Sequence, residues 1–119
     1  MRRNISSGSS YESAVGYSRA VRVGPNIAVA GTTGSGDDVI AQTRDALRRI
    51  EMALHEAGAS LRDVVRTRIY VTDITDWRDV GAAHAEVFGD IRPVATMVEV
   101  SALIQPGLLI EADAYEPGD

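Results

Sequence analysis

Apolar residues recur at steps of three and four positions between residues 40 and 57, a spacing that predicts an amphipathic helix. The face that they form consists of Ile40, Thr43, Leu47, Ile50 and Leu54, with Ala46, Ala53 and Ala57 beside them. Asp37 and Asp38 precede this segment and suit the positive end of a helix dipole. Gly58 follows it and favours the backbone conformation that commonly ends helices.

Apolar and polar residues alternate in residues 64–73, VVRTRIYVTD, and many of the apolar ones are β-branched. This pattern is typical of a strand with one buried face. Similar short runs predict further strands over residues 17–23, 26–31, 95–100 and 108–116. The turn residues GPN and QPG separate or precede some of these strands, as expected for connections in a sheet.

A second helix is predicted over residues 77–88, WRDVGAAHAEVF, with Thr75 or Asp76 as its N-terminal cap and Gly89 after its end. The element order is then β-β-α-β-α-β-β, which indicates an α+β fold with two helices packed on one face of a mixed sheet. No repeat or linker interrupts the chain, so we expect residues 1–119 to form a single domain. Residues 1–16 are rich in Ser and Gly, and we expect an N-terminal loop with a disordered tip.

The second face of the sheet carries charges of both signs. Strand alternation places Arg66, Arg68 and Tyr70 opposite a buried set made of Val65, Thr67, Ile69 and Val71, and places Glu111 and Asp113 opposite Ile110, Ala112 and Ala114. Leu109 and Met97 are expected among these charges. Two interpretations remain open, a solvated outer face or a face buried against copies of the same chain.

Composition narrows the class of protein. The net charge of −5 argues against a nucleic-acid partner, because affinity for nucleic acid comes mainly from neutralising phosphates. No stretch approaches the roughly 18 apolar residues that span a bilayer, so no membrane partner is expected. The chain has no cysteine, and its start lacks the apolar segment of a secretory signal. We therefore expect a cytoplasmic protein without disulfides or thiolate metal sites.

The sequence contains no complete motif for a nucleotide cofactor or a metal ion. The Gly-rich run GTTGSGDD has Asp37 where a phosphate-binding loop needs lysine, and Val39 where a dinucleotide fold needs its third glycine. His55 and His84 do not form the i, i+4 pairs of helical metal sites. We therefore predict no cofactor and no metal. Glu99 and Glu111 lie in apolar strands, where each is either a solvent-facing residue or a site carboxylate.

Five segments in a fixed order resemble one protein family. They are YSRAVRVG from Tyr17, a strand that ends with AG at Gly31, AQTRDALRRIEMALHEAGASLRDVVRTRIYVTDITDW from Ala41, VFGDIRPVATMVEV from Val87 and IEADA from Ile110. Together they resemble the RidA family, also called the YjgF or reactive-intermediate (imine) deaminase family. The resemblance extends from Ile5 to Tyr115, nearly the whole chain.

The resemblance implies a chorismate-mutase-like fold and a homotrimer, in which three sheets form a central barrel with clefts between the subunits. It therefore favours the self-buried sheet face. Active members are hydrolases that convert enamines and imines such as 2-aminoacrylate to 2-keto acids and ammonia, with no metal or organic cofactor. The implied partner is a small-molecule ligand in an intersubunit cleft. Some relatives carry an endoribonuclease label, which the acidic charge balance of this chain does not favour.

Three site residues carry over from the family without change. Tyr17 matches the cleft tyrosine, and Gly31 matches the glycine whose backbone meets the ligand. Glu111 matches the carboxylate that positions the attacking water.

Three other positions depart from the family pattern. Active members read P-A-R-S-[CT], whose arginine binds the substrate carboxylate through two hydrogen bonds. Here PVATM places Ala95 at the arginine position and Met97 two residues later, and Gly81 replaces the cleft asparagine. The chain therefore resembles an arginine-less branch of the family. Arg68 or Arg92 could supply another cation, although ion pairs of Arg68 with Glu99, Glu111 or Asp113 are the simpler interpretation.

Three hypotheses remain at this stage. In the first, Val94, Ala95 and Met97 make the cleft apolar, and the protein binds and hydrolyses a small imine-, enamine- or carbonyl-type metabolite other than the usual 2-imino acids, with Glu111 activating water. In the second, the same fold is a non-catalytic metabolite-sensing or regulatory protein. In the third, Arg68 restores a residual deaminase activity.

Overall fold

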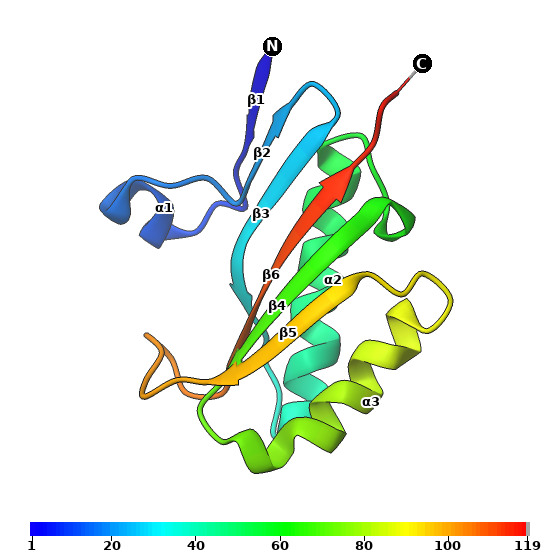
Figure 1. The fold of residues 1–119 in the computed structure, drawn as a ribbon. Coiled ribbons are helices and arrows are strands. Elements are labelled where there is room, and N and C mark those ends of the chain that lie inside the picture. Colours follow the sequence, from blue (N-terminus) through cyan, green and yellow to red (C-terminus); the bar gives the residue numbers. More distant parts are fainter. Residues whose placement is uncertain (119) are drawn as a thin grey trace.

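The computed structural model describes residues 1–118, which form one six-stranded mixed sheet with helices α2 and α3 on a single face (Figure 1). The strand order across the sheet is β1-β2-β3-β6-β4-β5, and only the β4–β5 pair is parallel. The strands are β1 (Arg2–Ile5), β2 (Ala20–Val23), β3 (Asn26–Thr33), β4 (Val64–Val71), β5 (Val94–Glu99) and β6 (Leu108–Tyr115), and the helices are α1 (Ser10–Val15), α2 (Val39–Glu56) and α3 (Trp77–Phe88). The predicted α+β fold and the element order of residues 20–115 are confirmed.

The predicted buried face of helix α2 is also confirmed. The buried side of α2 packs Leu47, Ile50 and Leu54 against the sheet, and each of these residues is almost fully inaccessible to solvent. The Asp38 side chain accepts a hydrogen bond from the Ala41 amide at 2.8 Å, so the aspartate is a true N-cap. Gly58 follows the helix with a φ of 83°, as its sequence position predicts.

The prediction of a loop over residues 1–16 is wrong. β1 pairs antiparallel with β2, with Arg2 opposite Val23, and α1 follows it. α1 begins at the Ser9 cap and ends at Gly16, whose φ of 90° suits glycine. Sequence periodicity does not reveal β1 because three of its four residues are exposed. The strand is held by its pairing with β2, and not by a buried apolar face.

Two side chains lie on the opposite face from the predicted one. A register shift between Val64 and Arg66 turns Val65 outward, where half of it is exposed, because a β-bulge adds one unpaired residue. Met97 pairs with the buried Ile69 and packs against the core on the helix side, since paired residues of neighbouring strands share a face.

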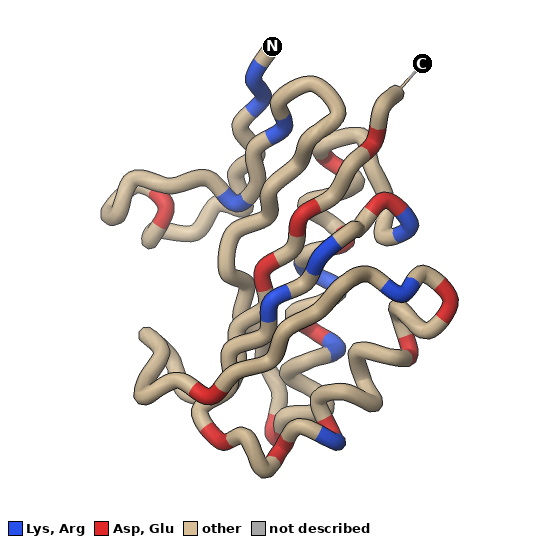
Figure 2. Tube along the Cα trace, in the orientation of Figure 1, with Lys and Arg blue, Asp and Glu red and all other residues tan. Residues whose placement is uncertain are grey.

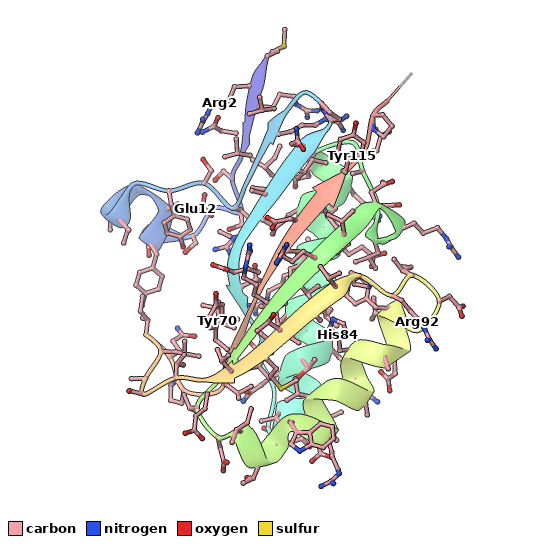
Figure 3. All side chains as sticks on the ribbon, in the orientation of Figure 1. Arg2, Glu12, Tyr70, His84, Arg92 and Tyr115 are labelled. Atoms are coloured by element: carbon pink, nitrogen blue, oxygen red, sulfur yellow. The ribbon has the colours of Figure 1, made fainter. Side chains whose placement is uncertain are left out.

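The face of the sheet opposite the helices carries the alternating charges that the sequence predicts. Basic positions of β4 lie beside acidic positions of β6 in the centre of the sheet (Figure 2). Figure 3 shows that Tyr70 belongs to this region, whereas Glu12 lies apart on the N-terminal segment. None of the helices in residues 1–118 combines the length and the apolar character that crossing a bilayer requires.

Candidate functional site

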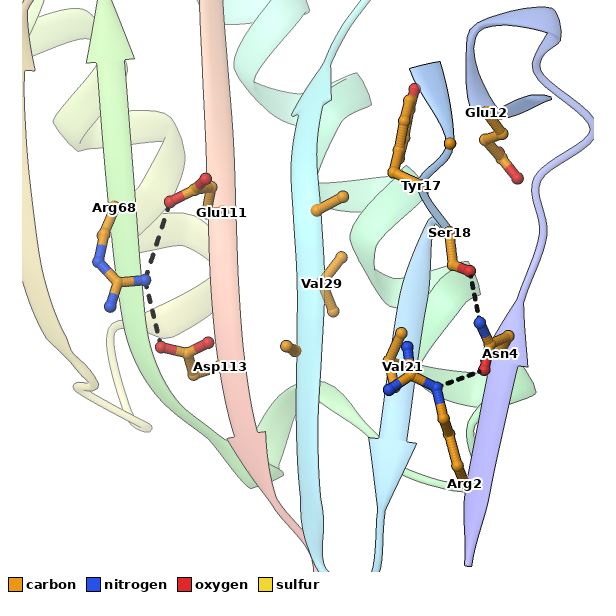
Figure 4. A pocket seen from close by; sticks show the side chains of 13 residues that line it. Arg2, Asn4, Glu12, Tyr17, Ser18, Val21, Val29, Arg68, Glu111 and Asp113 are labelled. Carbon is orange, nitrogen blue, oxygen red and sulfur yellow. Dashed lines mark hydrogen bonds and ion pairs between the residues drawn. The ribbon is translucent and has the colours of Figure 1, made fainter. Parts of the chain in front are cut away.

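Glu111 lies in a polar cluster on the open face of the sheet (Figure 4). The Tyr70 hydroxyl donates a hydrogen bond to Glu111 Oε1 at 3.1 Å, and Arg68 Nη1 lies 3.8 Å from the same oxygen. Arg68 Nη1 is closer to Asp113 Oδ2, at 3.2 Å. The register places Arg68 directly opposite Glu111 and Arg66 opposite Asp113, so cross-strand pairing builds the cluster.

Tyr70 is a fixed hydrogen-bond donor in this cluster. Burial, and then the neighbouring Glu111 carboxylate, raise the pKa of the Tyr70 phenol above its ordinary value of 10.0. The phenol therefore keeps its proton at neutral pH and holds one oxygen of Glu111, while the second oxygen has no hydrogen-bond partner among residues 1–118.

Two adjoining hollows meet beside Glu111. One, of about 690 Å³, lies over the open face and includes Arg68 and Asp113 in its lining. The other is a groove of about 960 Å³ between the N-terminal segment, the end of β3 and helix α2. Tyr17, Ala30 and Glu111 line both, and Gly31 lines the groove. The structure thus brings together four of the predicted site residues, Tyr17, Gly31, Arg68 and Glu111.

The groove runs along a free strand edge. β2 begins at Ala20, so Gly31 and Thr33 of β3 have no strand neighbour on that side. Arginine side chains satisfy their carbonyl oxygens instead, since Arg19 Nη1 donates to Gly31 O at 2.8 Å and Arg49 Nη1 donates to Thr33 O at 3.1 Å. Arg19 Nη2 also donates to the Tyr17 hydroxyl at 3.3 Å, which orients the tyrosine.

Gly31 leaves space that the Leu109 side chain fills. A Cβ added at this position would lie 2.6 Å from Leu109 Cδ2, well inside contact distance. Leu109 is the β6 partner of Thr33 and lines the same groove. The glycine therefore lets the leucine side chain close over β3 at the floor of the groove.

Glu12 joins two parts of the N-terminal segment that borders the groove. Its carboxylate is buried and accepts hydrogen bonds from the Ser6 hydroxyl at 2.9 Å, the Ser7 amide at 3.0 Å and the Ser7 hydroxyl. The Ser7 hydroxyl is the main reason that the pKa of Glu12 is lowered from 4.5. This contact joins the segment after β1 to helix α1 and so places Tyr17, which follows α1.

The other predicted residues lie at the opposite edge of the sheet. Ala95 and Met97 belong to the edge strand β5, and Gly81 lies in α3 with open space where a Cβ would stand. Ala95 pairs with Thr67, whose hydroxyl lies 3.0 Å from His84 Nε2. His84 also stacks at a tilt on Phe88, and burial lowers its pKa from 6.5.

Within one chain, Ala95 and Glu111 do not share a pocket. Ala95 pairs with Thr67 and Thr67 with Ala112, so Ala95 and Ala112 are on the helix face of the sheet. Glu111, one residue before Ala112, points to the open face. The predicted site is therefore divided between the two faces of the protomer.

Comparison with known proteins identifies the family. The family model described as endoribonuclease L-PSP matches residues 7–115. A crystal structure of a Mycobacterium tuberculosis member of the YjgF family is 71% identical and superimposes with a TM-score of 0.95, covering 97% of this chain and 99% of that one. The chain belongs to the RidA/YjgF family.

Two curated relatives of this RidA/YjgF chain extend the comparison. A RutC family protein of Pyrococcus abyssi is 38% identical over 109 residues, which cover 84% of this chain and 86% of the relative. The 3-aminoacrylate deaminase RutC of Acinetobacter baylyi is 39% identical over 74 residues, which cover 62% of this chain and 58% of the relative.

The two candidate replacement cations of this RidA/YjgF chain already have partners. Arg68 lies within 4.0 Å of both Asp113 and Glu111, which agrees with the ion-pair interpretation. Arg92 Nε donates to Gly89 O at 3.0 Å, folding back on the end of α3, and its φ is 54°. Glu99 Oε1 accepts from the Ile74 amide at 3.0 Å and so supports the turn before α3.

Sequence reasoning did not assign the contacts of three residues that lie in or near the two halves of the candidate site. They are Tyr70, His84 and Arg19. Strand alternation places Tyr70 on the face of Glu111, which was the available signal for it. Arg19 reaches Gly31 and His84 reaches Thr67 only after folding, so neither contact leaves a periodic pattern in the sequence. Within residues 1–118 no group of three or more His, Cys, Asp or Glu side chains could hold a metal ion.

Proposed function

We propose that the protein is a homotrimer that binds a small imine-, enamine- or carbonyl-type metabolite in clefts between subunits and hydrolyses it with water held by Glu111. The observation that carries this proposal is the division of the site. Glu111, Tyr17 and Gly31 line one hollow region, whereas Ala95 and Gly81 lie at the opposite edge on the other face. Only a second copy can bring such halves together in one cleft.

The open face supports this assembly. Val65, Val94 and Val98 expose 50%, 60% and 40% of their surface there or at its edge, beside the paired charges of β4 and β6. Exposed apolar side chains among satisfied ion pairs are typical of a surface that another protein surface covers.

The chemistry follows from the free oxygen of Glu111. In the proposed reaction, Glu111 accepts a proton from water as the water oxygen bonds to the C=N carbon and passes that proton to the nitrogen, which gives a carbinolamine. The hydroxyl proton of the carbinolamine then moves to the nitrogen through Glu111, the C–N bond breaks as the C=O bond forms, and the carbonyl product and ammonia leave. Tyr70 holds the carboxylate in position at 3.1 Å. The name of the A. baylyi relative, a deaminase of 3-aminoacrylate, supports an enamine as the substrate class.

The usual 2-imino acids are expected to react weakly or not at all. Ala95 offers a methyl group where active relatives bind the substrate carboxylate with arginine, and Gly81 adds no amide. Losing one charge-assisted hydrogen-bonded pair costs about 1.5–3 kcal/mol, roughly a tenfold to hundredfold loss of transition-state affinity. Arg68 does not replace the lost cation in the proposed site because Asp113 and Glu111 hold it.

Coupled hydrolysis assays and light scattering test the proposal. The purified protein is measured for trimer mass and is then added to enzymes that generate 2-aminoacrylate, 3-aminoacrylate or uncharged imines. Glu111→Gln serves as the inactive variant, and Glu51→Gln, which changes a partly exposed carboxylate on α2, as the matched control. We expect a trimer that accelerates at least one substrate outside the 2-imino acids, and loss of that acceleration in Glu111→Gln alone.

Other outcomes have clear meanings. A monomer in solution would overturn the intersubunit cleft. Ligand binding without turnover, unaffected by Glu111→Gln, would replace the enzyme with the metabolite-sensing protein of the same fold.

A further inference from the structure

Arg19 differs from the other half-buried arginines. Within residues 1–118 four arginines are partly covered, Arg19, Arg22, Arg49 and Arg68. Three of them lie close to a carboxylate, at 3.3 Å for Arg22 and Glu116, 3.0 Å for Arg49 and Asp45, and 3.2 Å for Arg68 and Asp113. No described carboxylate lies within 4.0 Å of Arg19.

The partners of Arg19 are all neutral. Its Nη1 donates to Gly31 O at 2.8 Å and to Thr32 Oγ1 at 3.0 Å, and its Nη2 donates to the Tyr17 hydroxyl at 3.3 Å. A guanidinium has five N–H groups, so these contacts leave two without a described acceptor. A partly buried cation that meets only neutral groups is incompletely compensated.

The nearest acidic group is already engaged. Arg19 lowers the pKa of Glu12 through its charge, but this is the smallest of the causes acting on Glu12. The Glu12 oxygens accept instead from Ser6 and Ser7. The Glu12 carboxylate therefore holds the N-terminal segment and does not neutralise the charge of Arg19.

Arg19 lies where its charge can contact a bound ligand. Arg19 lines the groove of about 960 Å³ together with Tyr17, Gly31 and Glu111. Its contacts to Gly31 and Tyr17 hold the guanidinium against the free edge of β3. A ligand carboxylate can take up the two remaining N–H groups, since guanidinium and carboxylate match in geometry.

We propose that Arg19 is the anion-recognition residue of the groove, and that the ligand is a small carbonyl or imine compound with a carboxylate bound beside Tyr17 and Gly31. This inference rests on the proposed function and names its substrate class. It places the ligand's charge at the Tyr17 end of the site and not at Ala95. The bound ligand is thus turned relative to a 2-imino acid held at the family's arginine position.

The role of Arg19 is tested by comparing the binding of a carboxylic acid with that of its uncharged ester. The probes are 4-oxopentanoate and its methyl ester, followed by calorimetry and by amide shifts of Gly31 and Tyr17. We expect the wild-type protein to bind the acid at least about tenfold more tightly than the ester, the value of one charge-assisted contact. Arg19→Gln should remove that preference and Arg19→Lys should retain part of it.

Arg44→Gln is the control, because it removes one positive charge from an exposed arginine outside the groove that pairs with Glu86 at 2.7 Å. It should keep the preference of the wild type. Equal binding of acid and ester by the wild type, no binding of the acid, or an unchanged preference in Arg19→Gln would each overturn the assignment. The wild-type comparison decides alone if Arg19→Gln does not fold.

The two proposals fail separately. Acid binding through Arg19 with no turnover of any imine removes the hydrolysis and leaves the anion site. Turnover of uncharged imines that depends on Glu111 but not on Arg19 removes the anion site and leaves the hydrolysis.

Discussion

Ala95 and Glu111 lie on opposite faces of the same sheet, although both occupy positions that the family resemblance assigns to one ligand. Ala95 pairs with Thr67 on the helix side, and Glu111 pairs with Arg68 on the open side. Glu111, the proposed water-positioning carboxylate, and Ala95, at the position that the resemblance assigns to an arginine, thus belong to separate halves of the proposed cleft. A substitution at Ala95 is therefore expected to change the stability of the protomer through Thr67, and one at Glu111 through Arg68.

Tyr70→Phe tests the donor that holds Glu111. The phenol pKa is raised in the folded protein, so its contribution to stability is present below the ordinary value of 10.0 and is lost as pH rises above it. We expect the wild type to lose free energy of unfolding between about pH 9 and 11, and Tyr70→Phe to lose less. Urea titrations across that range provide the measurement, and parallel pH curves for the two proteins would contradict the assignment.

Gly31→Ala and Gly81→Ala form a matched pair with opposite expected signs. A Cβ at Gly31 meets Leu109 Cδ2 at 2.6 Å, so overpacking should destabilise the protein by about 1–3 kcal/mol. A Cβ at Gly81 meets nothing within 4 Å in the interior of α3, so alanine should stabilise by about 0.5–1 kcal/mol. Urea denaturation of both variants gives the two values, and a shift of the same sign in both would be against the prediction.

His84 should make stability fall on mild acidification. Burial lowers its pKa, so the folded state favours the neutral ring and its contribution is present above the ordinary value of 6.5. That contribution is lost as pH falls below 6.5 toward the folded pKa. We expect the melting temperature of the wild type to drop between about pH 7 and 5.5, and a flatter curve for His84→Gln.

His55→Gln is the control for this experiment because His55 is exposed on α2, 3.8 Å from Glu51. It should keep the pH dependence of the wild type. An equal flattening in both variants would show that the drop does not come from the His84 site.

Glu12→Gln should loosen the N-terminal segment. The Glu12 carboxylate is buried and accepts three hydrogen bonds from Ser6 and Ser7. The neutral glutamine accepts these hydrogen bonds less strongly, so we expect the free energy of unfolding to fall by about 1–3 kcal/mol. Because the pKa of Glu12 is lowered, the stabilisation is present above 4.5 and is lost as pH falls below that value. Hydrogen exchange of residues 6–16 should accelerate while that of α2 stays slow, and unchanged exchange in the N-terminal segment would refute the role.

Local periodicity accounts for much of the fold. The core face of α2 and the alternation of β6 are visible in the sequence because one continuous face of each element is buried. β1 lacks such a face, since only Ile5 is buried, and its order depends on pairing with β2. Val65 was misplaced because a bulge shifts the alternation by one residue, which no local pattern reveals.

The sequence by itself determined the family to which the chain belongs, through motifs that extend over nearly the whole chain, and it named Tyr17, Gly31 and Glu111 as candidate site residues. The tertiary structure decided which of these residues meet. Strand register brings Tyr70 to Glu111, and at the free edge of β3 Arg19 reaches Gly31 with no carboxylate of residues 1–118 within 4.0 Å. Side-chain identity is local information, whereas the charge that an arginine leaves uncompensated depends on every neighbour that folding brings near it.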